Sequence, residues 1–351
     1  MGRLTSFMDE AYPRSLDIGG LADPAFSLDT ARITAWAAQL AYEATPPPPP
    51  GQPAVLDRIA GQWGWGPPHS IQQDMALDGS HRMARGYIAQ VGGAGILAFC
   101  GTEPDRLSDW RIDFDFLRHR DGVSRGVRAA LDKVWPEITG NLAATTGPVL
   151  ICGHSLGGAF AVLAAQKLAT THDPAARRLR AVYTFGMPRI GNIAFVTLYN
   201  NLLGGRLGQS TYRLVHGVDL VPRVPPAGTG PLQFRHVGRA LACGSGERFQ
   251  APPGPPVIEN TDGNLTETLR LLDDSFASWD RLVATLGYEV QSWLPESVRS
   301  LLPAPDRPPS PPFPARYPEA KGARFLLPAF RDHLMDGYLR ALGVVFPTDG
   351  T

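Results

Sequence analysis

The sequence predicts an α/β protein with a mostly parallel central sheet and helices on both of its faces. Short apolar runs typical of buried strands alternate with segments of helical periodicity between residues 85 and 216. One strand-like run, residues 149–152, leads through a small-residue turn directly into an apolar helix-like run at residues 159–165. Strands that alternate with helices are typical of parallel sheets. Apolar residues make up 43% of the 351 residues, enough to bury a sizeable core.

The periodicity of apolar residues and the positions of turn residues place each helix and strand along the sequence. Five prolines at 46–50 end the first helix, and the glycine-rich turn at 92–95 separates two strands. We expect a helix at 28–44, strands at 86–90 and 96–100, a helix at 123–143, strands at 181–185 and 212–216, a long amphipathic stretch at 264–301 and a last helix at 331–342.

This order indicates two parts. We expect residues 1–84 to form an N-terminal helical extension packed on a core domain of residues 85–351. Within the core domain, proline-rich segments flank the amphipathic stretch, so residues 241–326 are interpreted as an insertion or cap.

Charge and cysteine content exclude several functional classes. Lys and Arg number 33, as do Asp and Glu, so nothing argues for a nucleic-acid partner or an anionic membrane. Three cysteines do not suggest a disulfide framework. The chain shows neither zinc-type ligand spacing nor a phosphate loop, so we expect no metal and no cofactor. It shows neither a secretory leader nor a membrane-spanning run, so a cytoplasmic location is the default expectation.

Residues 153–159, Gly-His-Ser-Leu-Gly-Gly-Ala, have the form of a nucleophile elbow. A serine on a sharp strand-to-helix turn is exposed to substrate, and the helix N-terminus then faces the developing negative charge. The alternative is a small-residue turn without chemistry. The flanking strand and helix favour Ser155 as a nucleophile.

A serine nucleophile needs a base, and the base needs a carboxylate that orients it. Asp219 follows the strand at 212–216 and is the candidate acid, because a carboxylate at a strand end can reach a histidine near the elbow. Two histidines follow it. His236 lies in what looks like a short strand, residues 234–237, and His333 lies where the last helix begins. Position favours His333 and leaves His236 as the alternative.

Four motifs together resemble the class 3 lipases, the fungal-type triacylglycerol lipases with their bacterial and plant relatives, and indicate a bacterial-type member. They are the elbow, Phe-Gly-Met-Pro-Arg-Ile-Gly-Asn at 185–192, Asp-Leu-Val-Pro-Arg-Val-Pro-Pro at 219–226, and Ala-Phe-Cys-Gly-Thr-Glu at 98–103. Asp332-His333 with Tyr338 is similar to the C-terminal histidine block of the family. Cys100 stands where the family usually has arginine, and a His-x-Gly-Phe motif is replaced at residues 124–127.

The resemblance implies an α/β-hydrolase fold with Ser155 as nucleophile, Asp219 as acid and His333 as base, and a structural role for His236. It also implies two oxyanion-hole donors. One is the backbone N–H of Leu156, after the nucleophile, and the other is Thr102. For Thr102 the alternative is a plain turn residue.

Two segments are candidates for covering the site. In fungal relatives a mobile lid occupies the position of residues 103–116, and Trp110 matches the tryptophan that such a lid presents to lipid. Ordinary packing is the alternative for Trp110. The apolar stripe of residues 264–301 could line an acyl groove or pack on the core.

These observations support a serine ester hydrolase that cleaves acylglycerols through an acyl-enzyme intermediate. A phospholipase A1 or a small-ester carboxylesterase would use the same triad, because acyl preference depends on groove shape. A non-catalytic binding module is the remote alternative, against which the serine, aspartate and histidine argue. We expect a lipid or ester substrate, transient contact with a lipid interface, and no protein partner.

Overall fold

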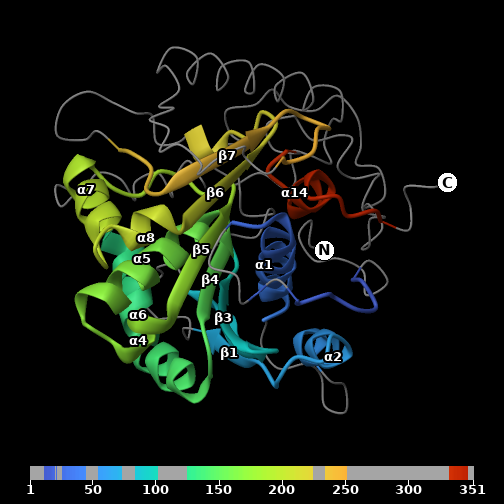
Figure 1. Ribbon diagram of the computed structural model, residues 1–351, viewed down its shortest axis with the longest axis horizontal. Coiled ribbons are helices and arrows are strands. Elements are labelled where there is room, and N and C mark those ends of the chain that lie inside the picture. Colours follow the sequence, from blue (N-terminus) through green and yellow to red (C-terminus); the bar gives the residue numbers. More distant parts are fainter. Residues whose placement is uncertain are drawn as a thin grey trace, which may run out of the picture.

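The computed structural model describes residues 12–19, 21, 26–44, 54–72, 84–101, 125–223, 234–250 and 332–346. These residues form one central sheet with helices against both faces (Figure 1).

The sheet has seven strands that lie side by side in chain order. The first three are antiparallel neighbours, and every pairing from the third strand to the seventh is parallel. The strands are β1 (His69–Gln72), β2 (Arg85–Val91), β3 (Ala94–Phe99), β4 (Val149–His154), β5 (Leu179–Phe185), β6 (Thr211–His216) and β7 (Arg239–Cys243). Because β3 to β7 are parallel, their C-terminal ends meet along one edge of the sheet.

The helices that connect the parallel strands lie together on one face of the sheet (Figure 1). This follows from the strand order, since right-handed crossovers that always step in the same direction place every connecting helix on the same side. The helices on this face are α4 (Arg125–Ala144), α5 (Leu156–Thr170), α6 (Pro174–Arg178), α7 (Ile193–Asn201) and α8 (Arg206–Gln209).

The other face is covered by elements from the two ends of the chain (Figure 1). These are α1 (Leu28–Leu40), the 3-10 turn η2 (Ala41–Glu43), α2 (Val55–Gln62) and α14 (Met335–Ala341). Alternating residues of each strand therefore enter different cores. In β4, Leu150 and Cys152 contact the α1 side, whereas Val149 and Ile151 contact the α5 side. Because the side chains on both faces of β4 are buried, the strand is a continuous apolar run in the sequence.

Most predicted elements agree with the structure to within a few residues. The strand expected at 234–237 is wrong, because there Arg235 forms only an isolated bridge with Gly191. Neither β1 nor β7 was predicted from the sequence. β7 includes residue 241, where the predicted insertion begins. The division into residues 1–84 and 85–351 stays a prediction, and β1 from the first part pairs with β2 from the second.

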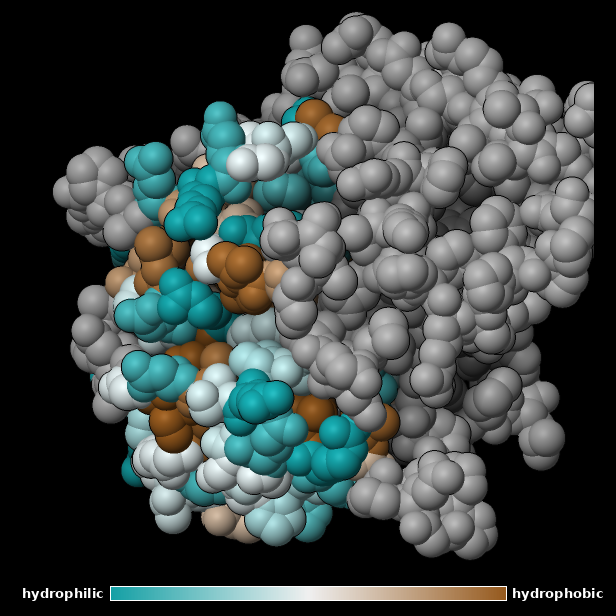
Figure 2. Space-filling model, turned by 90° about the vertical axis from the view of Figure 1, so that its right-hand side faces the viewer, coloured by the Kyte–Doolittle hydropathy of each residue, from teal (hydrophilic) through white to brown (hydrophobic). Residues whose placement is uncertain are grey.

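The described surface is mixed in character. On the face in Figure 2, hydrophobic and hydrophilic residues alternate in small areas over the coloured part of the molecule. Large hydrophobic side chains that are exposed within the described ranges are Ile193, Leu198 and Val345. Among the helices of these ranges, none combines the length and apolar character needed to cross a bilayer.

Candidate active site

Ser155 occupies a sharp turn between the end of β4 and the start of α5. Its φ of 56° and ψ of −128° are unusual for a residue with a side chain, as in strained elbows that present a nucleophile. Two glycines permit the turn. A Cβ on Gly153 would lie 2.1 Å from the Gly157 carbonyl oxygen, and one on Gly157 would lie 2.4 Å from the Phe99 carbonyl oxygen. The spacing Gly-x-Ser-x-Gly therefore follows from the close approach of strand and helix.

The Ser155 side chain lies between the strand ends of β3 and β5. Its backbone N–H donates to the Phe185 carbonyl at 2.8 Å. A Cβ on Gly101 would lie only 2.6 Å from the Ser155 Cβ, so the chain after β3 passes directly over the serine. The Ser155 hydroxyl is buried and makes no hydrogen bond to the described residues.

Leu156, a predicted oxyanion donor, is the first residue of α5. The first N–H groups of a helix have no partner within the helix, and they form the positive end of its dipole. Thr102, the other predicted donor, lies outside the described residues, as do Trp110, the segment 103–116 and the amphipathic stretch 264–301.

Asp219 is fully buried and accepts three kinds of donor. The Val221 N–H reaches Oδ1 at 2.9 Å, and the Tyr338 hydroxyl reaches Oδ2 at 2.6 Å. His333 Nδ1 lies 3.0 Å from Oδ1 and 2.9 Å from Oδ2. Burial, and then the charge of Asp219, raises the pKa of Tyr338 well above its ordinary value. The phenol therefore keeps its proton and donates a hydrogen bond to the carboxylate.

His333 lies in the turn before α14 and is also buried. An ionised carboxylate only accepts hydrogen bonds, so the short contacts with Asp219 place the imidazole proton on Nδ1. The lone pair of the neutral ring is then on Nε2, as a general base requires. The structure thus pairs Asp219 with His333, 114 positions apart, and the Ser155 turn is at the same sheet edge.

The neighbouring carboxylate of Asp332 anchors the turn that carries His333. Asp332 Oδ2 accepts from the Val218 N–H at 3.0 Å and from the Ser245 hydroxyl. The turn that carries His333 is therefore joined to the Asp219 turn and to the chain beyond β7.

His236 is engaged elsewhere. Its Nε2 lies 2.7 Å from the Pro222 carbonyl oxygen, which it reaches as a donor. Burial, and then the charges of Arg213 and Arg189, lowers the pKa of His236 well below its ordinary value. A neutral His236 that supports the loop after Asp219 suits the structural role implied for it.

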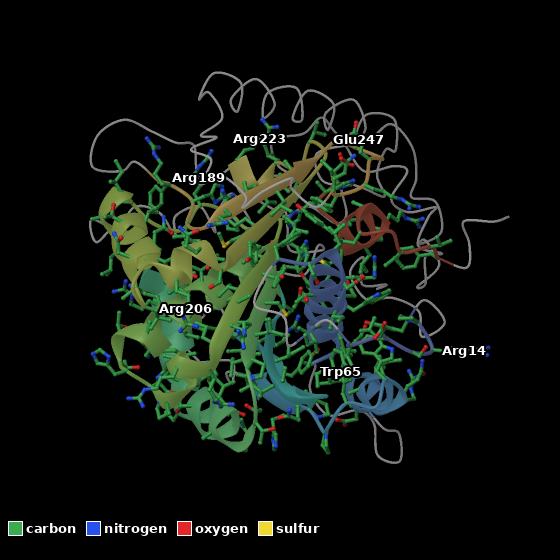
Figure 3. The ribbon with its side chains drawn as sticks, viewed as in Figure 1. Arg14, Trp65, Arg189, Arg206, Arg223 and Glu247 are labelled. Carbon is green, nitrogen blue, oxygen red and sulfur yellow. The ribbon has the colours of Figure 1, made fainter. Side chains whose placement is uncertain are left out.

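A second contact supports the same loop. Arg189, from the Phe-Gly-Met-Pro-Arg-Ile-Gly-Asn stretch at the end of β5, donates through Nη1 to the Arg223 carbonyl oxygen. Figure 3 shows the two arginines close together near one end of β7. Arg223 ends the 3-10 turn η5 (Val221–Arg223). The Asp219 loop is thus supported from both His236 and Arg189.

Cys100, which stands where the family usually has arginine, has an arginine beside it. Arg85, opposite Cys100 across the sheet, donates from Nε to the Cys100 sulfur at 3.1 Å. A guanidinium from the adjacent strand therefore lies beside position 100.

The contacts of Tyr42, His154 and Asp332 were not predicted from the sequence. His154 was visible only as a variable letter of the elbow motif, and Asp332 only as the neighbour of His333. Tyr42 carries no signal in the sequence, because its contacts reach residues 59 and 112 positions away.

Comparison with solved structures supports the class of fold. The LIP2 lipase of Yarrowia lipolytica superposes with a TM-score of 0.50 at 19% identity, covering 67% of this chain and 85% of that one. Together with the sheet of mostly parallel strands and the serine elbow after β4, this likeness defines an α/β-hydrolase fold, as predicted.

Sequence comparison finds related proteins. Residues 97–229 match the family model described as Lipase (class 3). The secreted mono- and diacylglycerol lipase 1 of Fusarium solani is 35% identical over 141 residues, which are 37% of this chain and 38% of that protein. The chloroplastic phospholipase A1-Igamma1 of Arabidopsis thaliana is 28% identical over 198 residues, 51% of this chain and 36% of that protein. The matches thus span less than two fifths of either relative.

Proposed function

We propose that this protein is a serine ester hydrolase that cleaves carboxylic esters of acylglycerols. The observation that carries the proposal is the buried contact between His333 Nδ1 and Asp219, at the same edge of the sheet as the strained Ser155 turn. A buried aspartate that orients a histidine beside an elbow serine has the chemistry of acyl transfer.

In the proposed reaction, Ser155 Oγ attacks the ester carbonyl while His333 Nε2 takes the hydroxyl proton. The imidazolium is stabilised by Asp219, whose charge is held by Val221 and Tyr338. His333 then gives the proton to the departing alcohol, which leaves an acyl group on Ser155. Water, deprotonated by the same His333, releases the carboxylic acid.

The negative charge on the tetrahedral intermediate requires donors aimed at it. We assign this role to the backbone N–H groups of Leu156 and Thr102. Support comes from the position of Leu156 at the start of α5 and from the approach of Gly101, the residue before Thr102, to the serine.

We expect the proposed reaction to need no cofactor, since serine, histidine and aspartate supply nucleophile, base and charge. Within the described ranges, no group of three or more His, Cys, Asp or Glu side chains could hold a metal ion. A cytoplasmic location stays a prediction that cell fractionation would test.

The substrate is proposed to be a lipid ester met at an interface. The Fusarium relative is named a mono- and diacylglycerol lipase, which supports acylglycerols. The Arabidopsis relative is named a phospholipase A1, which supports the second candidate, a phospholipid. A small soluble ester is the third candidate. For Trp110 and residues 264–301, lid or groove roles remain predictions.

One experiment separates the three candidates. Purified protein is assayed against p-nitrophenyl esters of increasing chain length, an emulsified triacylglycerol and a phosphatidylcholine, with Ser155→Ala as control. We expect fatty acid release from the emulsion, and none with Ser155→Ala. Faster fatty acid release from phosphatidylcholine than from the triacylglycerol would identify a phospholipase A1 instead. Hydrolysis of short soluble esters alone would identify a carboxylesterase. No hydrolysis of any ester would refute the proposal.

A further inference from the structure

A chain of three buried hydrogen bonds connects the segments around Ser155. The Gly101 N–H donates to the Tyr42 hydroxyl oxygen at 3.0 Å. The same hydroxyl lies 2.6 Å from His154 Nδ1, and His154 Nε2 lies 2.7 Å from the His333 carbonyl oxygen. The side chains of Tyr42 and His154 are almost completely buried.

The donor and acceptor properties of these atoms fix the direction of all three hydrogen bonds. A carbonyl oxygen only accepts, so His154 Nε2 must carry a proton. Burial, and then the charge of nearby His333, holds the pKa of His154 well below its ordinary value, although its bond to the His333 carbonyl acts in the opposite direction. A neutral imidazole has a single N–H, so Nδ1 accepts from the Tyr42 hydroxyl. The oxygen of that hydroxyl in turn accepts from Gly101.

Three of the residues that these hydrogen bonds join belong to different parts of the proposed catalytic machinery. Gly101 precedes Thr102, His154 precedes Ser155, and the His333 carbonyl belongs to the base itself. The bonds join residues 59, 112 and 179 positions apart, so local sequence cannot fix their relative positions. The His154 and His333 rings also lie against each other, with centroids 4.6 Å apart and planes inclined by 32°.

The proposed reaction makes strict demands on these positions. His333 must become an imidazolium without turning away from Ser155, and the segment after β3 that contains Gly101 must stay beside the serine to stabilise the oxyanion. A ring at position 154 that remains neutral adds no positive charge next to the imidazolium. Its two hydrogen bonds tie the backbone of residue 333 to Tyr42 and, through Tyr42, to Gly101.

We propose that Tyr42 and His154 are positioning residues. They hold His333, the base, and the Gly101 segment after β3 in their positions beside Ser155. This inference rests on the proposed function. The competing explanation is that the three bonds only satisfy buried polar groups, as buried groups generally require. Such a structural role would affect stability without affecting turnover by the folded protein.

Conservative variants separate the two explanations. Tyr42→Phe removes the hydroxyl that links Gly101 to His154. Tyr87→Phe is the matched control, because Tyr87 is equally buried and its hydroxyl donates only to the Ala37 carbonyl in α1, at 3.2 Å. We expect the unfolding temperature to fall in both variants, and to fall further in Tyr42→Phe, because this substitution removes two buried hydrogen bonds and Tyr87→Phe removes one. We expect kcat on a p-nitrophenyl ester to fall ~10-fold or more in Tyr42→Phe alone, with KM within ~2-fold, because small misplacements of reacting groups cost up to ~100-fold in rate.

Two substitutions of His154 then test each half of the link. His154→Gln brings an amide N–H near the position of Nε2 and can still donate to the His333 carbonyl. His154→Asn brings its amide near Nδ1 and can still accept from Tyr42, but it cannot reach His333. We expect kcat to fall further in His154→Asn than in His154→Gln, which retains the anchor of the base.

The possible outcomes have distinct meanings. Equal kcat in Tyr42→Phe and Tyr87→Phe would overturn the positioning role while leaving the proposed function intact. A wild-type protein without esterase activity would instead refute the proposed function. If His154→Asn does not fold, the comparison of Tyr42→Phe with Tyr87→Phe still decides.

Discussion

Tyr338→Phe tests the environment of the buried acid. The substitution removes only the hydroxyl, which donates to Asp219 Oδ2 at 2.6 Å and accepts a longer hydrogen bond from the His216 N–H at 3.3 Å. Hydrogen bonds to charged groups contribute about 1.5–3 kcal/mol to stability, so we expect the free energy of unfolding to fall by about 2 kcal/mol. The phenylalanine ring keeps the packing of the tyrosine against Phe185 and Phe249. The loss therefore reports the hydroxyl rather than a cavity.

The measurement is urea unfolding of the variant, the wild type and a matched control. In Tyr199→Phe, the lost hydroxyl bonds a neutral partner, the Thr211 hydroxyl, at 2.8 Å. Neutral hydrogen bonds contribute about 0.5–1.5 kcal/mol, so the control should lose about half as much as Tyr338→Phe. Losses of equal size in the two variants would refute the idea that Asp219 is ionised and held by Tyr338.

The same pair of proteins should differ in pH dependence. Folding raises the pKa of Tyr338 above its ordinary 10.0, so its contribution to stability is present below pH 10 and is lost as the pH rises above that value. One proton changes stability by about 1.4 kcal/mol per pH unit. Wild type should thus approach Tyr338→Phe in stability above pH 10. A stability difference that stays constant across this range would contradict the raised pKa.

Three further predictions follow from the same geometry. His333→Ala should lower kcat by several orders of magnitude while His236→Ala mainly lowers the unfolding temperature; exchanged phenotypes would show that His236 is the base. Gly186→Ala should lower kcat sharply, because the added methyl would lie 2.7 Å from Asp219 Oδ2 and 2.8 Å from His333 Nδ1; unchanged activity would mean that this contact does not matter for turnover. Prolonged EDTA treatment should leave ester hydrolysis unchanged, and a loss restored by zinc or calcium would reveal a metal requirement.

Local patterns explain which parts of the fold the sequence predicted. The strand-to-helix run around Ser155 was readable because β4 is fully buried, most of α5 is buried, and the two elbow glycines meet backbone atoms. β7 was missed because it lies at the sheet edge, where its side chains are only partly buried and the apolar signal is weak. The short strand expected at His236 was wrong because that segment supports a loop instead of extending the sheet.

The candidate site shows the same division. Chain order and the strand end pointed to Asp219, but only the folded chain brings it within 2.9 Å of His333. Tyr42 could not be predicted, because it acts through a side-chain oxygen that meets two segments distant in sequence. Long-range contacts of this kind leave no periodicity or spacing in a single sequence.

The most direct test of the central claim is labelling with a fluorophosphonate followed by peptide mass spectrometry. The reagent reacts with a serine only where a base and oxyanion donors activate it. We predict one adduct, on Ser155, formed rapidly in the wild type, slowly in His333→Ala and not at all in Ser155→Ala. An adduct on another serine, or labelling of Ser155 that is equally fast without His333, would contradict the proposed catalytic triad.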